Sequence, residues 1–271
     1  MTVQDSARRK RQGFLSPALW IPAGLALALL GLPLVALVVR APWSRLPELL
    51  AQPSVGSALA LSLATGLMST AISLVLGIPL ALVLARSTQW AAVPRRLLRA
   101  LVTVPLVLPP VVGGVALLLL LGRRGLLGQL LPFQLPFTTA AVVIAQVFVA
   151  MPFLVLAVEG ALRASDRRFE TAAATLGASR FTIFRRITLP LVFPGVAAGA
   201  LLCFCRALGE FGATITFAGS FPGVTQTLPI ATYLQLQTDP DAAIALSLVL
   251  MVISATALVS LRDRWVPGVT T

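Results

Sequence analysis

The chain has 271 residues, of which 58% are hydrophobic and only 11% are charged, and its mean hydropathy is +0.94. About a quarter of the residues of a soluble domain are charged, and the apolar residues here fall in long blocks, so the composition excludes an ordinary soluble fold and predicts a membrane protein. The net charge of +12 comes from short clusters between these blocks, which indicate membrane topology rather than nucleic-acid binding.

Missing residue types exclude several chemistries. The chain has no histidine, and Lys10 is the only lysine. A G-x-x-x-x-G-K-[ST] phosphate-binding loop, Schiff-base catalysis and a histidine-based triad or zinc site are therefore excluded. We expect no catalytic residue, cofactor or metal on this chain, so any ATP and magnesium must bind to another one. Cys203 and Cys205 do not face each other on a helix and are expected to be small core residues.

Six apolar runs are long enough to cross the hydrocarbon core, which takes about 20 helical residues. They are approximately Trp20–Val39, Ser57–Ala85, Leu97–Leu121, Thr138–Val158, Val192–Phe217 and Ala242–Leu261. The sequence therefore predicts an all-α polytopic protein, with a tail at 1–18, one transmembrane domain at 19–261 and a tail at 262–271. The first run follows basic residues as a signal peptide does, but its length and the R-A-P-W that follows it favour a retained helix.

The basic residues are distributed unevenly between the two sides of such a topology. Most of the 21 basic residues lie on the side of the membrane that holds the N-terminus. They are Arg8, Arg9, Lys10, Arg11, Arg86, Arg95, Arg96, Arg99, Arg163, Arg167, Arg168, Arg180, Arg185, Arg186, Arg262 and Arg264. The other side holds Arg40, Arg45, Arg123 and Arg124. Because cytoplasmic loops are rich in lysine and arginine, this bias predicts that both termini are cytoplasmic, in a bacterial inner membrane.

Prolines and glycines interrupt the third run, which contains V-P-L-V-L-P-P-V-V-G-G from Val104 to Gly114. Proline removes a backbone donor, and the freed carbonyls must find partners in protein or in a water-filled cavity. The pattern therefore predicts a broken helix, which serves either a transport path or helix packing. In the fifth run, Gly195 and Gly199 form a G-x-x-x-G, which permits close helix approach within the chain or across a dimer.

The segment between the fourth and fifth runs is the most informative. Phe169–Leu176 is rich in helix formers, Ser165 or Asp166 could cap its start, and Gly177 is suited to end it in a left-handed conformation. A short amphipathic stretch follows, with Phe181, Ile183, Phe184 and Ile187 on its apolar side. Such a segment either docks into a cytoplasmic partner or lies on the membrane surface against anionic lipid.

This segment resembles the EAA loop of ABC-importer permeases, whose pattern is E-A-A, three residues, G, nine residues and I-x-L-P. Thr171 stands where that pattern has its glutamate, and Glu170 precedes it. Within residues 160–190, the resemblance assigns coupling to an ATPase to Glu170, Thr171, Ala172, Ala173, Gly177, Ala178, Ile187, Leu189 and Pro190. It implies a type I (MetI-like) importer fold, in which this loop docks into a groove of the ATPase subunit.

From about Ser57 onward the chain is similar to ModB-type permeases for molybdate or tungstate. The similarity rests on P-L-V-L-P-P-V-V-G-G in the third run, on R-A-L-G-E-F-G-A-T-I-T-F-A-G from Arg206 to Gly219, and on P-G-V-T-Q-T-L-P. Sulfate and thiosulfate permeases share the G-E-F-G and are the close alternative. The resemblance implies a homodimer, two ATPase subunits and an extracytoplasmic molybdate-binding protein that docks on outer segments such as Ser220–Asp241.

Arg206 and Glu210 are charges within a membrane run, which usually face a cavity or the interior of a bundle. At positions i and i+4 they can pair, so Arg206 either offers positive potential to a passing oxyanion or belongs to a purely structural ion pair. Thr214 and Thr216 could supply hydroxyl donors. Two alternatives of other classes, an integral-membrane enzyme and an ATP-independent carrier, are disfavoured by the scarcity of intramembrane catalytic groups and by the EAA-like loop.

Overall fold

The computed structural model describes residues 19–265, with side chains up to residue 260. The α-helices in order are α2 (Trp20–Val39), α3 (Leu46–Leu50), α4 (Pro53–Arg86), α5 (Ala92–Val107), α6 (Pro110–Leu121), α7 (Thr139–Ala164), α8 (Arg168–Thr175), α9 (Arg180–Ile183), α10 (Leu189–Leu208), α11 (Gly212–Ala218), α12 (Leu228–Thr238) and α13 (Pro240–Trp265). Short 3-10 turns lie at Ser87–Gln89 and Gly128–Leu130, and a π-helical turn at Phe184–Thr188 joins α9 to α10. The predicted all-α class is confirmed.

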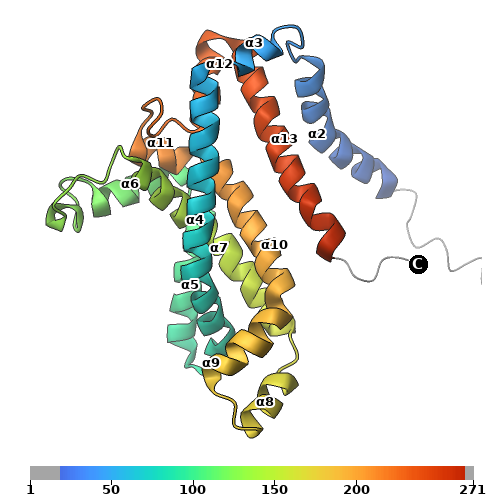
Figure 1. Ribbon diagram of the computed structural model, residues 1–271, viewed down its shortest axis with the longest axis vertical. Helices are drawn as coiled ribbons and strands as arrows, with labels where there is room; N and C mark the ends of the chain where they lie inside the picture. The colour runs from blue at the N-terminus through green and yellow to red at the C-terminus, as the bar shows by residue number, and fades with distance from the viewer. Residues whose placement is uncertain (1–18, 266–271) are drawn as a thin grey trace, which may run out of the picture.

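Helices α4, α7 and α10 form the centre of the molecule and run along its long axis (Figure 1). The buried face of α4 carries small polar residues in place of large apolar ones: Ser62, Thr65, Ser69, Thr70 and Ser73, with Gly66 and Gly77. Small residues allow helices to approach closely in a membrane. The hydroxyls of Thr65, Ser69 and Thr70 donate to carbonyls of their own helix, so burying them leaves few donors unpaired.

Helix α7 lies between two apolar cores. Leu154, Val155 and Val158 pack with residues of α4 and α10, whereas Val142 and Ala145 pack with residues of α6 and α11. The buried Gln146 lies on the same helix, within the stretch that packs against α6 and α11, and donates its side-chain N–H to Thr65 Oγ1 of α4 at 3.2 Å. The position of α7 fixes the other helices relative to one another.

The six predicted membrane runs correspond to five long apolar helices and one bent pair among the described residues. The first run matches α2 residue for residue. The third is not one continuous span, because α5 and α6 meet at an angle of 117°. Leu108 and Pro109 adopt extended conformations there, and the residue before a proline is disfavoured in a helix.

The fifth predicted run is also broken, which corrects the expectation of one span over Val192–Phe217. Helix α10 ends at Leu208, and α11 begins at Gly212. Glu210 Oε1 accepts the Ala213 N–H at 2.8 Å, so the Glu210 carboxylate caps the new helix. At its other end α10 begins earlier than predicted, because the π-helical turn runs into it without a loop.

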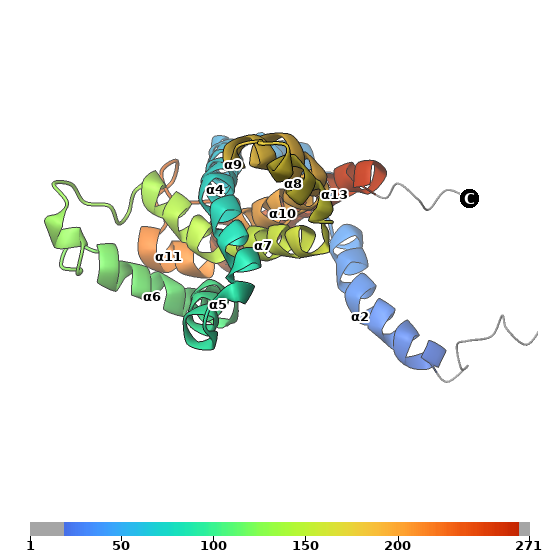
Figure 2. The ribbon, with the colours of Figure 1, turned by 90° about the horizontal axis from the view of Figure 1, so that it is seen from below.

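Helix α2 lies apart from the bundle, beyond α13, and buries none of its residues (Figures 1 and 2). Its side chains are almost entirely apolar, and an apolar surface of this size is expected to face lipid or another chain. The predicted tail at 1–18 lies outside the described residues. Of the predicted tail at 262–271, residues up to Trp265 continue α13.

Candidate functional site

The EAA-like segment forms a projection at one end of the long axis, where α8 and α9 extend beyond the bundle (Figure 1). Helix α8 begins at Arg168, whose N–H donates to Oδ1 of Asp166 at 2.9 Å. The cap position belongs to Arg167, which makes no side-chain capping bond, so Asp166, predicted as a cap, instead holds the turn one residue before it. Ser165 has a different position, since it ends α7 and its N–H donates to the Ala161 carbonyl.

Gly177 ends α8 as predicted, with a φ of 82°. The Ala178 N–H donates to the Ala173 carbonyl at 3.0 Å, which is the bond of a helix that closes in the left-handed conformation. Ser179 then caps α9 by accepting the Thr182 N–H at 3.2 Å, a signal that the sequence analysis missed. The turn at Asp166, the cap at Ser179 and the left-handed Gly177 therefore define the shape of the projection.

The outer face of the projection is apolar and uncovered by the described chain. Ala172 is exposed on α8 and Ala173 is half-buried, whereas the exposed Thr171 and Ala174 line a pocket with Glu170 on the inner side of the helix. Leu176 is 87% exposed at the end of the helix, and Phe169 and Phe181 are also exposed. Neither Phe169 nor Leu176 was predicted from the sequence as an exposed contact. Large exposed apolar side chains at the end of a short helix are typical of a docking surface for another protein.

Glu170 is directed into the chain and not toward this outer face. Its Oε1 accepts the Thr188 hydroxyl at 2.6 Å, and its Oε2 lies 3.6 Å from Arg86 Nη2. The carboxylate thus joins α8 to the end of α4 and to the π-helical turn before α10. Thr171, which occupies the motif's glutamate position, donates its hydroxyl to the Arg167 carbonyl at 3.1 Å.

The rest of the motif forms the connection to the membrane. Ile187 is half-buried in the π-helical turn, Leu189 packs against the core of α4, α7 and α10, and Pro190 lies in the first turn of α10. Proline has no backbone N–H to donate, so Pro190 removes one bond from the helical ladder directly after the π-helical turn. Helix continues from Arg180 to Leu208, so the projection and α10 move together.

A second charged cluster near this end was not predicted. The carboxylate of Glu159 on α7 is buried and pairs with Arg99 of α5 and with Arg163, the latter at 2.9 Å. An acidic residue in an otherwise apolar run signals such a partner. The sequence did not indicate that Arg99, which is 60 residues away, supplies it.

The predicted pair of intramembrane charges is confirmed, with Arg206 Nη1 2.6 Å from Glu210 Oε2. Glu210 is 1% exposed, whereas Arg206 is half-buried. Thr214 is fully buried, and its hydroxyl has no hydrogen-bond partner among the described residues. The half-buried Thr216 donates its hydroxyl to the Gly212 carbonyl at 2.8 Å.

Both broken spans meet at this point. A Cβ added to Gly114 of α6 would lie 2.7 Å from Thr216 Cβ and 2.8 Å from the Ala213 carbonyl oxygen, and one added to Gly212 would lie 2.9 Å from Pro110 Cβ. The glycines of the third run therefore allow α6 to pack directly on α11. This close packing gives the Pro-Gly pattern a structural role at the helix break itself.

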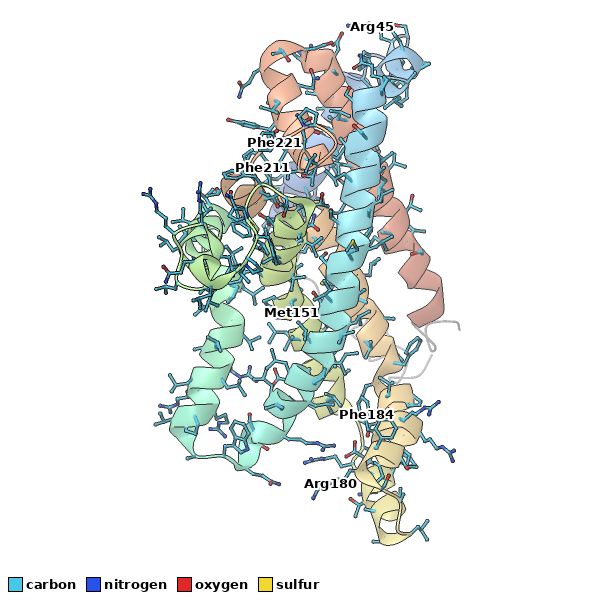
Figure 3. All side chains as sticks on the ribbon, turned by 60° about the vertical axis from the view of Figure 1, so that its left-hand side comes forward. Arg45, Met151, Arg180, Phe184, Phe211 and Phe221 are labelled. Carbon is cyan, nitrogen blue, oxygen red and sulfur yellow. The ribbon has the colours of Figure 1, made fainter. Side chains whose placement is uncertain are left out.

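Segment Ser220–Asp241 lies at the end opposite to α8, in the loop before α12 and on α12 itself (Figure 1). Arg45 pairs with Asp241 at 2.6 Å and with Asp239 at 3.8 Å, which holds the start of α13 to the region of α3. Figure 3 shows Arg45 at one end of the molecule and Arg180 at the other. The projection formed by α8 and α9 and the predicted docking segment therefore occupy opposite ends.

Comparisons with known proteins place this geometry among transport proteins. A family model described as "Binding-protein-dependent transport system inner membrane component" matches residues 77–267. The molybdenum transport system permease protein ModB of Mycobacterium tuberculosis is 50% identical over 248 residues, covering 90% of this chain and 93% of that protein. The sulfate transport system permease protein CysT of Salmonella typhimurium is 33% identical over 238 residues, covering 85% of each.

Among solved structures, a bacterial alginate ABC transporter in complex with a periplasmic protein bound to an alginate pentasaccharide has a similar fold. The TM-score is 0.68 with 16% sequence identity, over 96% of both chains. At this identity the similarity concerns the fold alone.

Proposed function

Because the chain belongs to the family of binding-protein-dependent transport system inner membrane components, we propose that it is the membrane-spanning permease subunit of an ATP-driven importer of molybdate or tungstate. The main support is the projection formed by α8 and α9, in which α8 carries exposed apolar side chains and α9 continues through the π-helical turn into α10. The 50% identity with a molybdenum permease, against 33% with a sulfate permease, favours molybdate over the sulfate alternative.

The proposed assembly contains two copies of this chain, two ATPase subunits and one extracytoplasmic binding protein. The ATPases bind ATP and magnesium and dock on α8, and the binding protein docks at the end formed by Ser220–Asp241. The loops at the α8 end carry most of the described arginines, which supports a cytoplasmic position for that end and for both termini. The chain itself contributes no catalytic group.

Coupling follows from the contacts of α8. A displacement of α8 by the ATPase reaches α4 through the Glu170–Arg86 pair and α10 through the Thr188 contact and the continuous backbone. Since α4, α7 and α10 share one core, the bundle responds as a unit. The permease can then alternate between inward- and outward-facing states without binding nucleotide.

We further place Arg206 beside the translocation pathway. Arg206 and Thr216 are half-buried and can reach a passing oxyanion, whereas the buried Glu210 and Thr214 position α11. Glu210 also cancels part of the positive charge, which suits conduction, because a pathway must bind its ion weakly enough to release it.

Replacement of the two charged residues by glutamine, singly and together, tests this role. Arg206→Gln is expected to lower molybdate uptake about tenfold, because the cationic donor is lost. Glu210→Gln, whose amide oxygen still accepts the Ala213 N–H, leaves Arg206 unpaired. The double variant removes both charges, so a purely structural pair predicts that its uptake recovers toward the unmodified level, whereas a pathway role predicts that it stays low. Uptake is measured at matched amounts of assembled transporter, and recovery in the double variant would refute the pathway role.

The function itself is tested by uptake of labelled molybdate in cells that carry or lack this chain together with its ATPase and binding protein. We expect uptake only in cells with the complete set, inhibited by unlabelled tungstate and resistant to a hundredfold excess of sulfate. Inhibition by sulfate at concentrations equal to molybdate would shift the assignment to a sulfate permease. Uptake by this chain alone in energised vesicles would contradict an ATP-driven importer.

A further inference from the structure

A pocket of about 420 Å³ lies near the α8 end, beside the start of α5. It is lined by Thr88, Arg95, Arg96, Arg99 and Arg163, so four of its five lining residues are arginines. It is separate from the outer face of α8 and from the Arg206 region.

The pocket carries a net positive charge in spite of its neighbouring carboxylate. Arg99 and Arg163 share the single buried carboxylate of Glu159. Arg95 and Arg96 have no acidic partner within ion-pair distance among the described side chains. Glu159 thus fixes two guanidinium groups in place, and the other two remain available for an anion. Guanidinium groups match the oxygens of a phosphate particularly well.

An apolar groove of about 350 Å³ follows the pocket along the same helix, lined by Ala100, Thr103, Val104, Val107, Leu108 and Pro109. Arg96, Ala100, Thr103 and Val107 are spaced i, i+4, i+7 and i+11, which places them on one face of α5. The Thr103 hydroxyl donates to the Arg99 carbonyl at 2.9 Å. From Arg96 to Val107 the helix rises about 16 Å, about half of the roughly 30 Å hydrocarbon core and therefore about one leaflet.

We propose that this face of α5 binds one anionic phospholipid, with the phosphate in the arginine pocket and an acyl chain in the groove. A free anion would use the pocket but not the groove. Trp90, which is 48% exposed just before α5, is a residue type enriched at the membrane interface and suits the level of a headgroup. Basic pockets between helices on the cytoplasmic side are suited to acidic headgroups. The choice of leaflet rests on the proposed orientation.

The test uses the full chain purified in detergent, with bound phospholipids counted by native mass spectrometry. Phosphatidylglycerol is expected to bind about tenfold more tightly than phosphatidylcholine with the same acyl chains. Arg95→Gln with Arg96→Gln should reduce this preference to about twofold or less, while Arg99, Arg163 and Glu159 keep their contacts. The matched control, Arg123→Gln with Arg124→Gln, removes two arginines from the loop after α6 and should retain the preference.

Two soluble anions distinguish a lipid from a free anion. Glycerol 3-phosphate, which has the phosphate without acyl chains, should bind at least about a hundredfold more weakly than phosphatidylglycerol. Inorganic phosphate at millimolar concentration should displace the lipid no better than chloride of equal ionic strength. Displacement by phosphate alone, equal binding of the two phospholipids, or an equal loss in the control pair would overturn the proposal. None of these outcomes bears on uptake, so the transport assignment is tested separately.

Discussion

Leu176→Asp is expected to reduce ATP-driven molybdate uptake roughly 30-fold or more while leaving the permease itself folded. Leu176 is 87% exposed at the end of α8, so its replacement removes little packing from the chain. In the proposed complex this side chain is buried against the ATPase, and a carboxylate would be desolvated there without a partner. Loss of a central interface residue lowers the binding free energy by about 2 kcal/mol or more, which corresponds to about 30-fold weaker affinity between the two subunits.

Two measurements separate coupling from folding in this variant. Molybdate uptake and co-purification of the ATPase should both fall. The melting temperature of the purified permease should stay nearly unchanged, corresponding to a change in the free energy of unfolding within about 0.5 kcal/mol. Leu126→Asp is the matched control, because Leu126 is 74% exposed in the loop after α6, and it should leave uptake intact. Full uptake with Leu176→Asp, or a loss of permease stability that explains the defect, would rule out α8 as the docking element.

Gly195→Leu is expected to destabilise the helix bundle by about 3 kcal/mol or more, at the upper end of what overpacking costs. A Cβ at Gly195 would lie well under 3.0 Å from Ala161 Cβ, and 3.7 Å from the Ala157 carbonyl oxygen. Gly199 makes a similar approach to Ala157 and Leu154. The G-x-x-x-G of the fifth run thus joins α10 to α7 within the chain, and any added side chain forces the two backbones apart.

A graded series checks this expectation. Gly195→Ala should also destabilise the helix bundle, but by less than Gly195→Leu, because the single methyl group already contacts Ala161. Gly160→Leu is the control, since Gly160 lies on α7 with nothing within 4 Å of an added Cβ. Glycine is less favourable in a helix than alanine by about 0.8–1 kcal/mol, and leucine ranks next to alanine, so this variant should melt slightly higher. Equal melting temperatures for Gly195→Leu and Gly160→Leu would show that the α7–α10 contact is not tight.

Hydropathy was sufficient to place the long helices, because crossing the membrane requires a continuous apolar length that few other structures need. Local chemistry also predicted the end of α8 at Gly177 and the Arg206–Glu210 pair, since both depend only on residues one or two turns apart. These features are encoded by neighbouring residues, and the structure confirms them.

The missed features depend on distant parts of the chain. Pro109 and Pro110 signal a break between α5 and α6, but the direction of the 117° bend is set by the packing of Gly114 against α11. The resemblance assigns Glu170 to the coupling loop but does not indicate its pairing with Arg86 and Thr188, which forms only when α4, α8 and the π-helical turn are brought together. Arg99 as a partner of Glu159 was not predicted for the same reason.

The continuous helix from Arg180 to Leu208 has a mechanical consequence. At 1.5 Å per residue, its 29 residues form a lever about 43 Å long, comparable to the full thickness of a bilayer with its headgroups. A tilt of about 10° around its middle would carry each tip sideways by about 4 Å. Arg206 lies close to the far tip. In the proposed importer, a modest torque applied at the tip next to α8 would therefore be converted into a shift wide enough to open or shut a passage for a small oxyanion.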